Sequence, residues 1–241
     1  MNFINFLKMK FHKYYHIWPL AYAFIYAPWF YYLEHRDQLN MVKVYYINCP
    51  LDNYIPFLPI FAIPYFIWFL YMPAIFIFLF YHSKKEFYRL CAFAFSGMTI
   101  ALIIYSVFPN GIHLRQELTG DGFLIQLIAI LRKSDTDTNV CPSIHVYGTL
   151  AAQICLSSSQ HIKGWVNRRH YNVISWIIAV LICLSTMFLK QHSIVDVISA
   201  VILVLIMYIV IFKICFKNVE FPKPKIDDPR EHQVLFFLNK H

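Results

Sequence analysis

Charged residues are scarce in this sequence. Only 14% of its 241 residues are Asp, Glu, Lys or Arg, whereas soluble domains average about 25%. Hydrophobic residues make up 59% of the chain and aromatic residues 19%. This composition excludes an ordinary soluble domain. It favours a membrane protein, provided that the apolar residues form runs of roughly 20, the length that crosses about 30 Å of hydrocarbon.

Motifs that mark several other protein classes are also missing. The six cysteines show no paired short spacing of the zinc-binding or redox kind. The 21 Lys and Arg residues are scattered between apolar runs and form no basic stripe, so the formal charge of +8 does not indicate a nucleic-acid partner. No compact group of carboxylates suggests a metal site. We therefore expect no metal, no cofactor and no nucleic acid.

Long apolar runs occur six times along the chain. The sequence therefore predicts an all-α, polytopic membrane protein, a six-transmembrane-helix bundle. The first run imitates a signal peptide, but its only small-x-small triplet lies in the middle of the run, so we expect an uncleaved first helix. The predicted spans are Tyr14–Tyr32, Tyr65–Tyr81, Leu90–Phe108, Pro142–Ser158, Asn172–Leu189 and Ser193–Phe216.

Two further apolar stretches are predicted not to cross the membrane. Tyr54–Pro64 carries repeated prolines, which favour an interfacial or re-entrant approach to the second span. Between the third and fourth spans, Phe123–Leu131 is too short to cross and is predicted to be an interfacial helix. The chain thus divides into an N-terminal segment 1–13, a membrane domain 14–216 and a soluble tail 217–241.

The positive charges predict the orientation of the bundle. With the N-terminus in the cytoplasm, the cytoplasmic segments hold most of the 21 Lys and Arg residues, as the positive-inside rule requires. We therefore expect a cell-membrane protein with both termini in the cytoplasm. The outer loops hold only Arg36, Lys43, Arg115, Arg132, Lys133 and Lys190.

The most informative ionisable residue is Asp196, which lies about one turn inside the last apolar span. A carboxylate there costs at least about 2.5 kcal/mol unless it is paired. His192 precedes it by four residues, which predicts that both lie on one helix face. The carboxylate can then hold one imidazole nitrogen and leave the other free as a nucleophile or base. The alternative is a structural pair at a helix start.

A second stretch with chemical potential is Cys141-Pro142-Ser143-Ile144-His145. Proline suits the first position of a helix, so Pro142 predicts that a helix begins there. The unpaired N–H groups of that helix start and the Ser143 hydroxyl would form an anion site suited to phosphate, with His145 beside it. An ordinary helix start with an interfacial histidine is the alternative.

Arg115 and Lys190 add positive charge on the predicted outer side, where the orientation rule does not place it. Arginine binds phosphate oxygens through two parallel hydrogen bonds, and lysine supplies a compact charge. Either residue alone is most simply a solvated surface cation. Their grouping with the histidine stretches on one side of the bundle favours a phosphate site.

These stretches resemble the type 2 phosphatidic acid phosphatase superfamily, whose pattern is Lys-x6-Arg-Pro, then Pro-Ser-x-His, then Ser-Arg-x5-His-x3-Asp. Pro142–His145 matches the second stretch, and His192–Asp196 matches the end of the third. Arg115 matches the first-stretch arginine, followed here by Gln116 instead of proline. The family lysine and the second arginine are missing, because Phe108 and Thr186 stand in their places.

The resemblance implies a six-helix membrane phosphatase without a metal. In it His192, oriented by Asp196, forms a phosphohistidine, and His145 acts as acid and then as base. Arg115, Ser143 and Lys190 would hold the phosphate, with Lys190 replacing the charge lost at Thr186. The substrate would be a lipid phosphate monoester or diphosphate, entering from the outer leaflet.

Three alternatives stay open at this point. The thinner cationic set is similar to the branch of sphingomyelin and inositol phosphorylceramide synthases, which transfer a phospholipid head group. A transporter with an intramembrane His/Asp relay is less consistent with the apolar mid-helix stretches. A catalytically degraded relative is the third alternative, suggested by Phe108 and Thr186.

Overall fold

The computed structural model describes residues 14–39 and 41–220, which are mostly helical with little strand. The predicted segment 1–13 and residues 221–241 of the predicted tail lie outside the described residues. The α-helices are α2 (Ala23–Gln38), α3 (Ala62–His82), α4 (Lys84–Val107), α5 (Phe123–Ser134), α6 (Ile144–Ser157), α7 (Gln160–Lys163), α8 (Arg168–Phe188) and α9 (Ile194–Tyr208). The remaining elements are the 3-10 helices η1 (Tyr15–Tyr22), η2 (Pro50–Tyr54) and η3 (Pro59–Phe61), the π-helix η4 (Ile209–Cys215) and the strands β1 (Tyr45–Tyr46) and β2 (Asn110–Gly111).

Four helical segments among the described residues are long and apolar enough to cross a membrane. They correspond to the predicted second, third, fifth and sixth spans, and they are Pro59–His82, Lys84–Val107, Arg168–Phe188 and Ile194–Cys215. At the predicted fourth span, α6 is apolar but has only 14 residues. The protein is therefore a helical membrane protein with four candidate spanning helices.

The predicted first span is a compound element. It begins as the 3-10 helix η1, which contains Pro19, and continues as α2, which contains Pro28. The α2 helix runs six residues past the predicted end at Tyr32, because its polar last turns have partners. Arg36 donates to the carbonyl oxygens of Tyr105 and Ser106 at 3.0 and 3.2 Å, and so caps the carboxyl end of α4.

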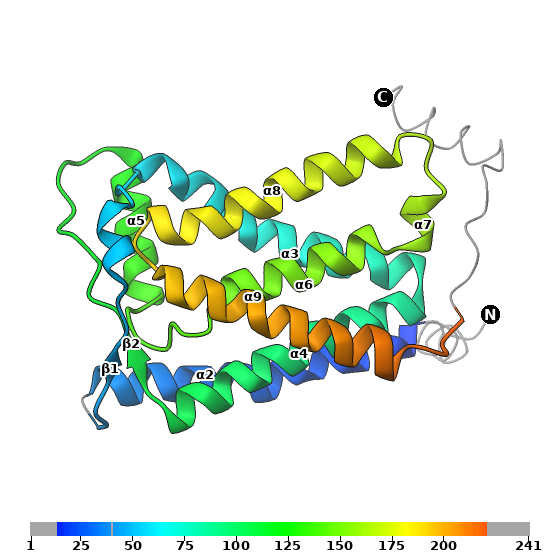
Figure 1. Ribbon diagram of the computed structural model, residues 1–241, viewed down its shortest axis with the longest axis horizontal. Coiled ribbons are helices and arrows are strands. Elements are labelled where there is room, and N and C mark those ends of the chain that lie inside the picture. Colours follow the sequence, from blue (N-terminus) through cyan, green and yellow to red (C-terminus); the bar gives the residue numbers. More distant parts are fainter. Residues whose placement is uncertain (1–13, 40, 221–241) are drawn as a thin grey trace, which may run out of the picture.

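The proline-rich stretch Tyr54–Pro64 forms no continuous helix in its first half, as predicted. It holds the end of η2 and the single turn η3, and α3 begins at Ala62. At the predicted interfacial helix, α5 begins at Phe123 and continues to Ser134. Figure 1 shows α5 across one end of the bundle, whereas α2, α3, α4, α6, α8 and α9 run along its long axis.

The short helix α6 lies in the centre of the bundle. It contacts α3, α4, α8 and α9, and most of its side chains are buried. It packs against α4 at Gly97, where an added Cβ would lie 1.9 Å from the Tyr147 ring. Gly97 therefore allows the two helices to pack closely, and the Tyr147 hydroxyl donates to the carbonyl oxygen of Phe93 at 2.6 Å.

The loops at one end of the bundle are tied together. Strands β1 and β2 pair in parallel, and Gly111 bridges to Thr138. Asn110 fixes the beginning of α6, since its side chain accepts from the N–H groups of Val140 and Cys141 and donates to the Cys141 carbonyl. The starts of α6 and α9 lie at this end, beside α5 and the strands (Figure 1).

Candidate active site

The three predicted stretches meet at this end of the bundle. The main-chain N–H of Ser143 donates to the carbonyl oxygen of Asp196 at 3.2 Å, which joins the start of α6 to α9. The Arg115 guanidinium donates to the side-chain oxygen of Gln191, which joins the loop after α4 to the turn before α9. Residues that are far apart in the sequence thus form one polar cluster.

His192 and Asp196 are adjacent, as predicted, but the predicted shared helix face is wrong. His192 precedes α9, whose cap is Ser193. A tight turn after α8 places it there: Lys190 has a φ of +58°, and the N–H groups of Gln191 and His192 both donate to the Thr186 carbonyl. The pair is therefore built by a turn and a helix cap.

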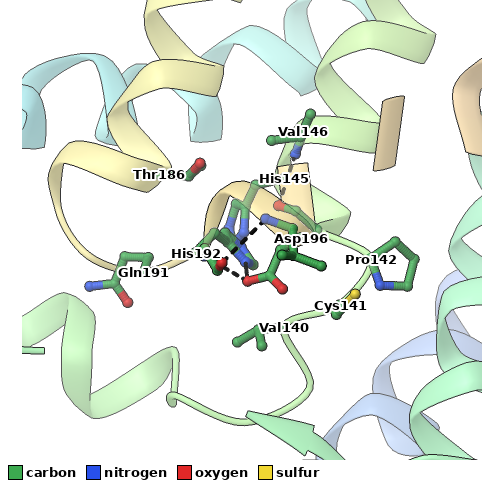
Figure 2. Close-up of polar contacts among 12 residues, drawn as sticks. Val140, Cys141, Pro142, His145, Val146, Thr186, Gln191, His192 and Asp196 are labelled. Atoms are coloured by element: carbon green, nitrogen blue, oxygen red, sulfur yellow. Dashed lines mark hydrogen bonds and ion pairs between the residues drawn. The ribbon is translucent and has the colours of Figure 1, made fainter. Parts of the chain in front are cut away.

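The Asp196 carboxylate has two roles. Its Oδ2 accepts from the Ser193 N–H at 2.8 Å, closing a capping box, and lies 3.4 Å from His192 Nδ1. Asp196 is fully buried and His192 is 6% exposed. Nδ1 of His192 thus faces the carboxylate, and a proton on Nδ1 would leave a lone pair on Nε2. Figure 2 shows this pair and the His145 ring beside it.

Asp52, which the sequence analysis missed, closes the start of α9. Its carboxylate accepts from the Ile194 N–H at 2.8 Å, the Ser193 hydroxyl at 2.6 Å and the Cys49 N–H at 2.8 Å. Asp52 is 1% exposed. A carboxylate here satisfies helix-start donors that would otherwise be buried without partners. The hydrogen-bond donors at the start of α9 are therefore already paired with protein groups and do not offer a phosphate site.

The start of α6 differs, because two of its main-chain N–H groups have no partner among the described residues. Ser143 is its cap and accepts from the Val146 N–H at 3.3 Å, so the prediction that Pro142 is the first helical residue is wrong. In residues 14–39 and 41–220, no hydrogen bond forms to the main-chain N–H groups of Ile144 and His145. Such a pair of donors at a helix start binds anions. Of the two helix starts, α6 is the one suited to phosphate.

The His145 ring lies between α3 and His192. Its centroid is 5.8 Å from that of His192 and 4.6 Å from that of Trp68. The Tyr65 hydroxyl lies 3.1 Å from His145 Nε2 and donates to Asp135 at 2.5 Å. Neither Tyr65 nor Asp135 was predicted to belong to the site.

The two predicted phosphate-binding cations contact protein oxygens. Arg115 donates to the carbonyl oxygens of Asp135 and Thr136 at 2.7 and 2.6 Å, as well as to Gln191. Lys190 Nζ donates to the Asp52 carbonyl oxygen at 2.6 Å. Burial lowers the pKa of Lys190, and the nearby Asp52 carboxylate opposes this shift. Both cations lie at the site, and their role in binding phosphate stays a prediction.

The positions of the two missing family cations differ in environment. Thr186 is fully buried in the last turn of α8, and its hydroxyl donates to the Cys183 carbonyl at 2.8 Å. Lys190 lies beyond the end of α8, so the prediction that it shares a helix face with Thr186 is wrong. Phe108 ends α4 and is 40% exposed. Neither position therefore carries the cation of the family pattern.

In the part of the chain that the structure describes, no group of three or more His, Cys, Asp or Glu side chains is arranged to hold a metal ion. A scan against protein-family models and searches of curated proteins and of solved structures found no match to this chain.

Proposed function

We propose that this protein is an integral membrane phosphatase of lipid phosphate esters, related to the type 2 phosphatidic acid phosphatases. The observation that carries the proposal is the pairing of His192 with the buried carboxylate of Asp196, 3.4 Å away, beside a second histidine. A nucleophile held by an acceptor, with a second acid–base group within reach, is the arrangement that covalent phosphoryl transfer requires.

In the proposed first step, the lone pair on His192 Nε2 attacks phosphorus and the bond to the ester oxygen breaks. Protonated His145 gives its proton to the departing alkoxide, so the lipid alcohol leaves neutral. The phosphohistidine that remains is positively charged on its ring, and the Asp196 carboxylate at Nδ1 stabilises this charge.

In the second step, His145 takes a proton from water, and the water oxygen attacks the phosphohistidine. The bond to His192 breaks and inorganic phosphate is released. The open N–H groups of Ile144 and His145, with Arg115 and Lys190 nearby, would stabilise the charge on the phosphoryl oxygens. The capping hydroxyl of Ser143 would position the same helix start.

The proposed topology has six crossings, with η1–α2 and α6 as the first and fourth. Figure 1 shows these elements parallel to the four candidate spanning helices, which supports their inclusion. The distribution of Lys and Arg supports cytoplasmic termini and a site that faces the outside of the cell membrane. In this topology α5, with Arg132 and Lys133 in its last turn, lies in the interface.

Cysteine labelling tests the orientation. Glu117 and Arg169 are both exposed and lie on opposite sides of the proposed membrane. In a variant lacking the exposed Cys215, Glu117→Cys should react with an impermeant maleimide in intact cells, and Arg169→Cys should react only after permeabilisation. The reverse pattern would place the site in the cytoplasm.

Head-group transfer is the alternative reaction at the same site. It is favoured by the absence of cations at Phe108 and Thr186, which matches the thinner set of the sphingomyelin and inositol phosphorylceramide synthases. In that reaction an acceptor alcohol takes the place of water in the second step.

A side-by-side assay tests the function. The purified protein is incubated with phosphatidic acid, or with a phospholipid donor plus ceramide or an inositol lipid, and the products are inorganic phosphate or a transferred head group. We expect phosphate release from phosphatidic acid. Transfer without release would establish the alternative, and neither product would support the degraded-enzyme interpretation.

A further inference from the structure

We propose that Tyr65 and Asp135 form a positioning pair for His145, equivalent to the role that Asp196 has for His192. The proposal rests on the phosphoryl-transfer function given above. It assigns a role to two residues that lie outside the sequence motifs of the site. In consequence each histidine of the site has its own carboxylate, and His145 exchanges its proton through a defined nitrogen.

The geometry determines the direction of the hydrogen bonds. Tyr65 lies on the first turn of α3 and is 1% exposed. Its hydroxyl has one proton, and the Asp135 carboxylate, 2.5 Å away, can only accept. The Tyr65 oxygen must then accept from His145 Nε2, which lies 3.1 Å away. The chain of donors therefore runs from His145 through Tyr65 to Asp135.

This direction fixes the tautomer of His145. Because Nε2–H is held by Tyr65, the neutral ring carries its lone pair on Nδ1. Protonation adds the second proton at Nδ1, and this is the proton that the departing alkoxide takes. When water attacks in the second step, Nδ1 takes a proton back. The Nε2 proton stays in place throughout, so Tyr65 and Asp135 are positioning residues and undergo no net change.

The loop that carries Asp135 is held rigidly enough for this role. Glu34, at the end of α2, accepts from the Thr136 hydroxyl and from the Asn139 side chain at 2.7 Å. Arg115 donates to the carbonyl oxygens of Asp135 and Thr136. Glu34 is 7% exposed. Contacts from α2, α3 and the loop after α4 thus place the Asp135 carboxylate.

The same hydrogen bonds could serve only to hold α3 against the loop that carries Asp135. Substrates with different leaving groups distinguish that structural role from the positioning of His145. The leaving group of phosphatidic acid is the diacylglycerol alkoxide, which needs a proton, whereas the leaving group of an alkyl-substituted nitrophenyl phosphate is a stable nitrophenolate anion, which does not. Loss of His145 positioning should therefore slow formation of the phosphohistidine only from the first substrate, whereas the second step, in which His145 acts as base, is common to both substrates. A general loss of folded protein would slow both substrates equally.

The variant that tests the proposal is Tyr65→Phe. We expect its single-turnover rate of phosphohistidine formation from phosphatidic acid to fall by at least about tenfold, and its single-turnover rate of nitrophenolate release to change by less than about threefold. His145→Ala should show the same split, and Asp135→Asn a weaker one. The matched control is Tyr71→Phe, also on α3, which loses a buried hydroxyl bond to Gln153 but should leave the ratio of the two rates unchanged.

A second measurement does not depend on turnover. Nitrogen-15 NMR of protein with labelled histidine rings, with the His145 signals assigned from His145→Ala, should report the Nε2–H tautomer, and Tyr65→Phe should change it. An Nδ1–H tautomer in the wild type, or equal slowing of the first step with both substrates in Tyr65→Phe, would overturn the pairing. If the wild type releases no phosphate from either substrate but keeps the Nε2–H tautomer, the proposed function fails and the pairing stands.

Discussion

Replacing His192 with alanine should abolish turnover. The proposed mechanism has a single nucleophile, and the Asp196 carboxylate that orients it has no other histidine within its recorded contacts. We expect phosphate release from phosphatidic acid to fall by at least about a thousandfold, because the covalent route is lost and only binding effects remain. We also expect no phosphoenzyme after acid-free quenching with radiolabelled substrate.

The matched control for this variant is His113→Ala. His113 is exposed in the loop after α4 and stacks on Tyr46 with ring centroids 3.5 Å apart, outside the proposed catalytic cluster. It should retain wild-type release and wild-type phosphoenzyme. A His192→Ala protein that still forms phosphoenzyme would move the nucleophile to another residue, and the central assignment of the site would be wrong.

Asp52→Ala should damage both stability and activity. The substitution leaves the Ile194 N–H, the Ser193 hydroxyl and the Cys49 N–H without their acceptor in a buried place. Each unpaired buried donor costs roughly 1–3 kcal/mol, so we expect a loss of at least about 2 kcal/mol in unfolding free energy. Because His192 directly precedes the cap at Ser193, the turn that presents the nucleophile should loosen as well.

Thermal unfolding in detergent, followed by the phosphate assay at a temperature where the variant is folded, measures the two effects separately. Asp121→Ala is the control, since Asp121 is exposed just before α5 and its main-chain carbonyl oxygen accepts from the Gln126 side chain. It should match the wild type in both measurements. If Asp52→Ala also matched the wild type, the capping role would be refuted.

The helical membrane character of this protein was predictable from the apolar runs. Four of those runs are helices of spanning length, and their positions agree closely with the prediction. Run length was less informative for the first and fourth runs. In the first, Pro19 falls in a 3-10 stretch, and Arg36 extends the helix by capping α4. In the fourth, the Ser143 cap makes the helix shorter than the apolar run.

Part of the site was predictable because helix starts have local signals. The stretches around His145 and His192 lie together, as their residue types suggested. His192 and Asp196 are brought together by a turn and a helix cap instead of by the predicted shared helix face. Tyr65 and Asp135 are 70 positions apart, and Asp52 is 141 positions from Ser193. Only the tertiary packing of loops against helices makes such pairs, so no spacing rule could have predicted them.

The count of positive charges in the sequence also did not separate surface cations from buried cations that bind main-chain carbonyl oxygens. Arg36 was counted with the outer-loop cations, but it is 8% exposed and binds the carboxyl end of α4 and Asp37. Lys190 is similarly buried against the Asp52 carbonyl. Charges that satisfy helix ends carry little information on topology.

The burial of the site has a kinetic consequence. His192 is 6% exposed and Asp196 is fully buried at the end of an apolar bundle. On the proposed topology, an enzyme of this shape meets substrate that is already dissolved in the lipid leaflet. Its rate should then follow the mole fraction of substrate in the membrane plane instead of the molar concentration in water. Adding inert lipid at a fixed amount of substrate would slow the reaction, although every bulk concentration of substrate stayed the same.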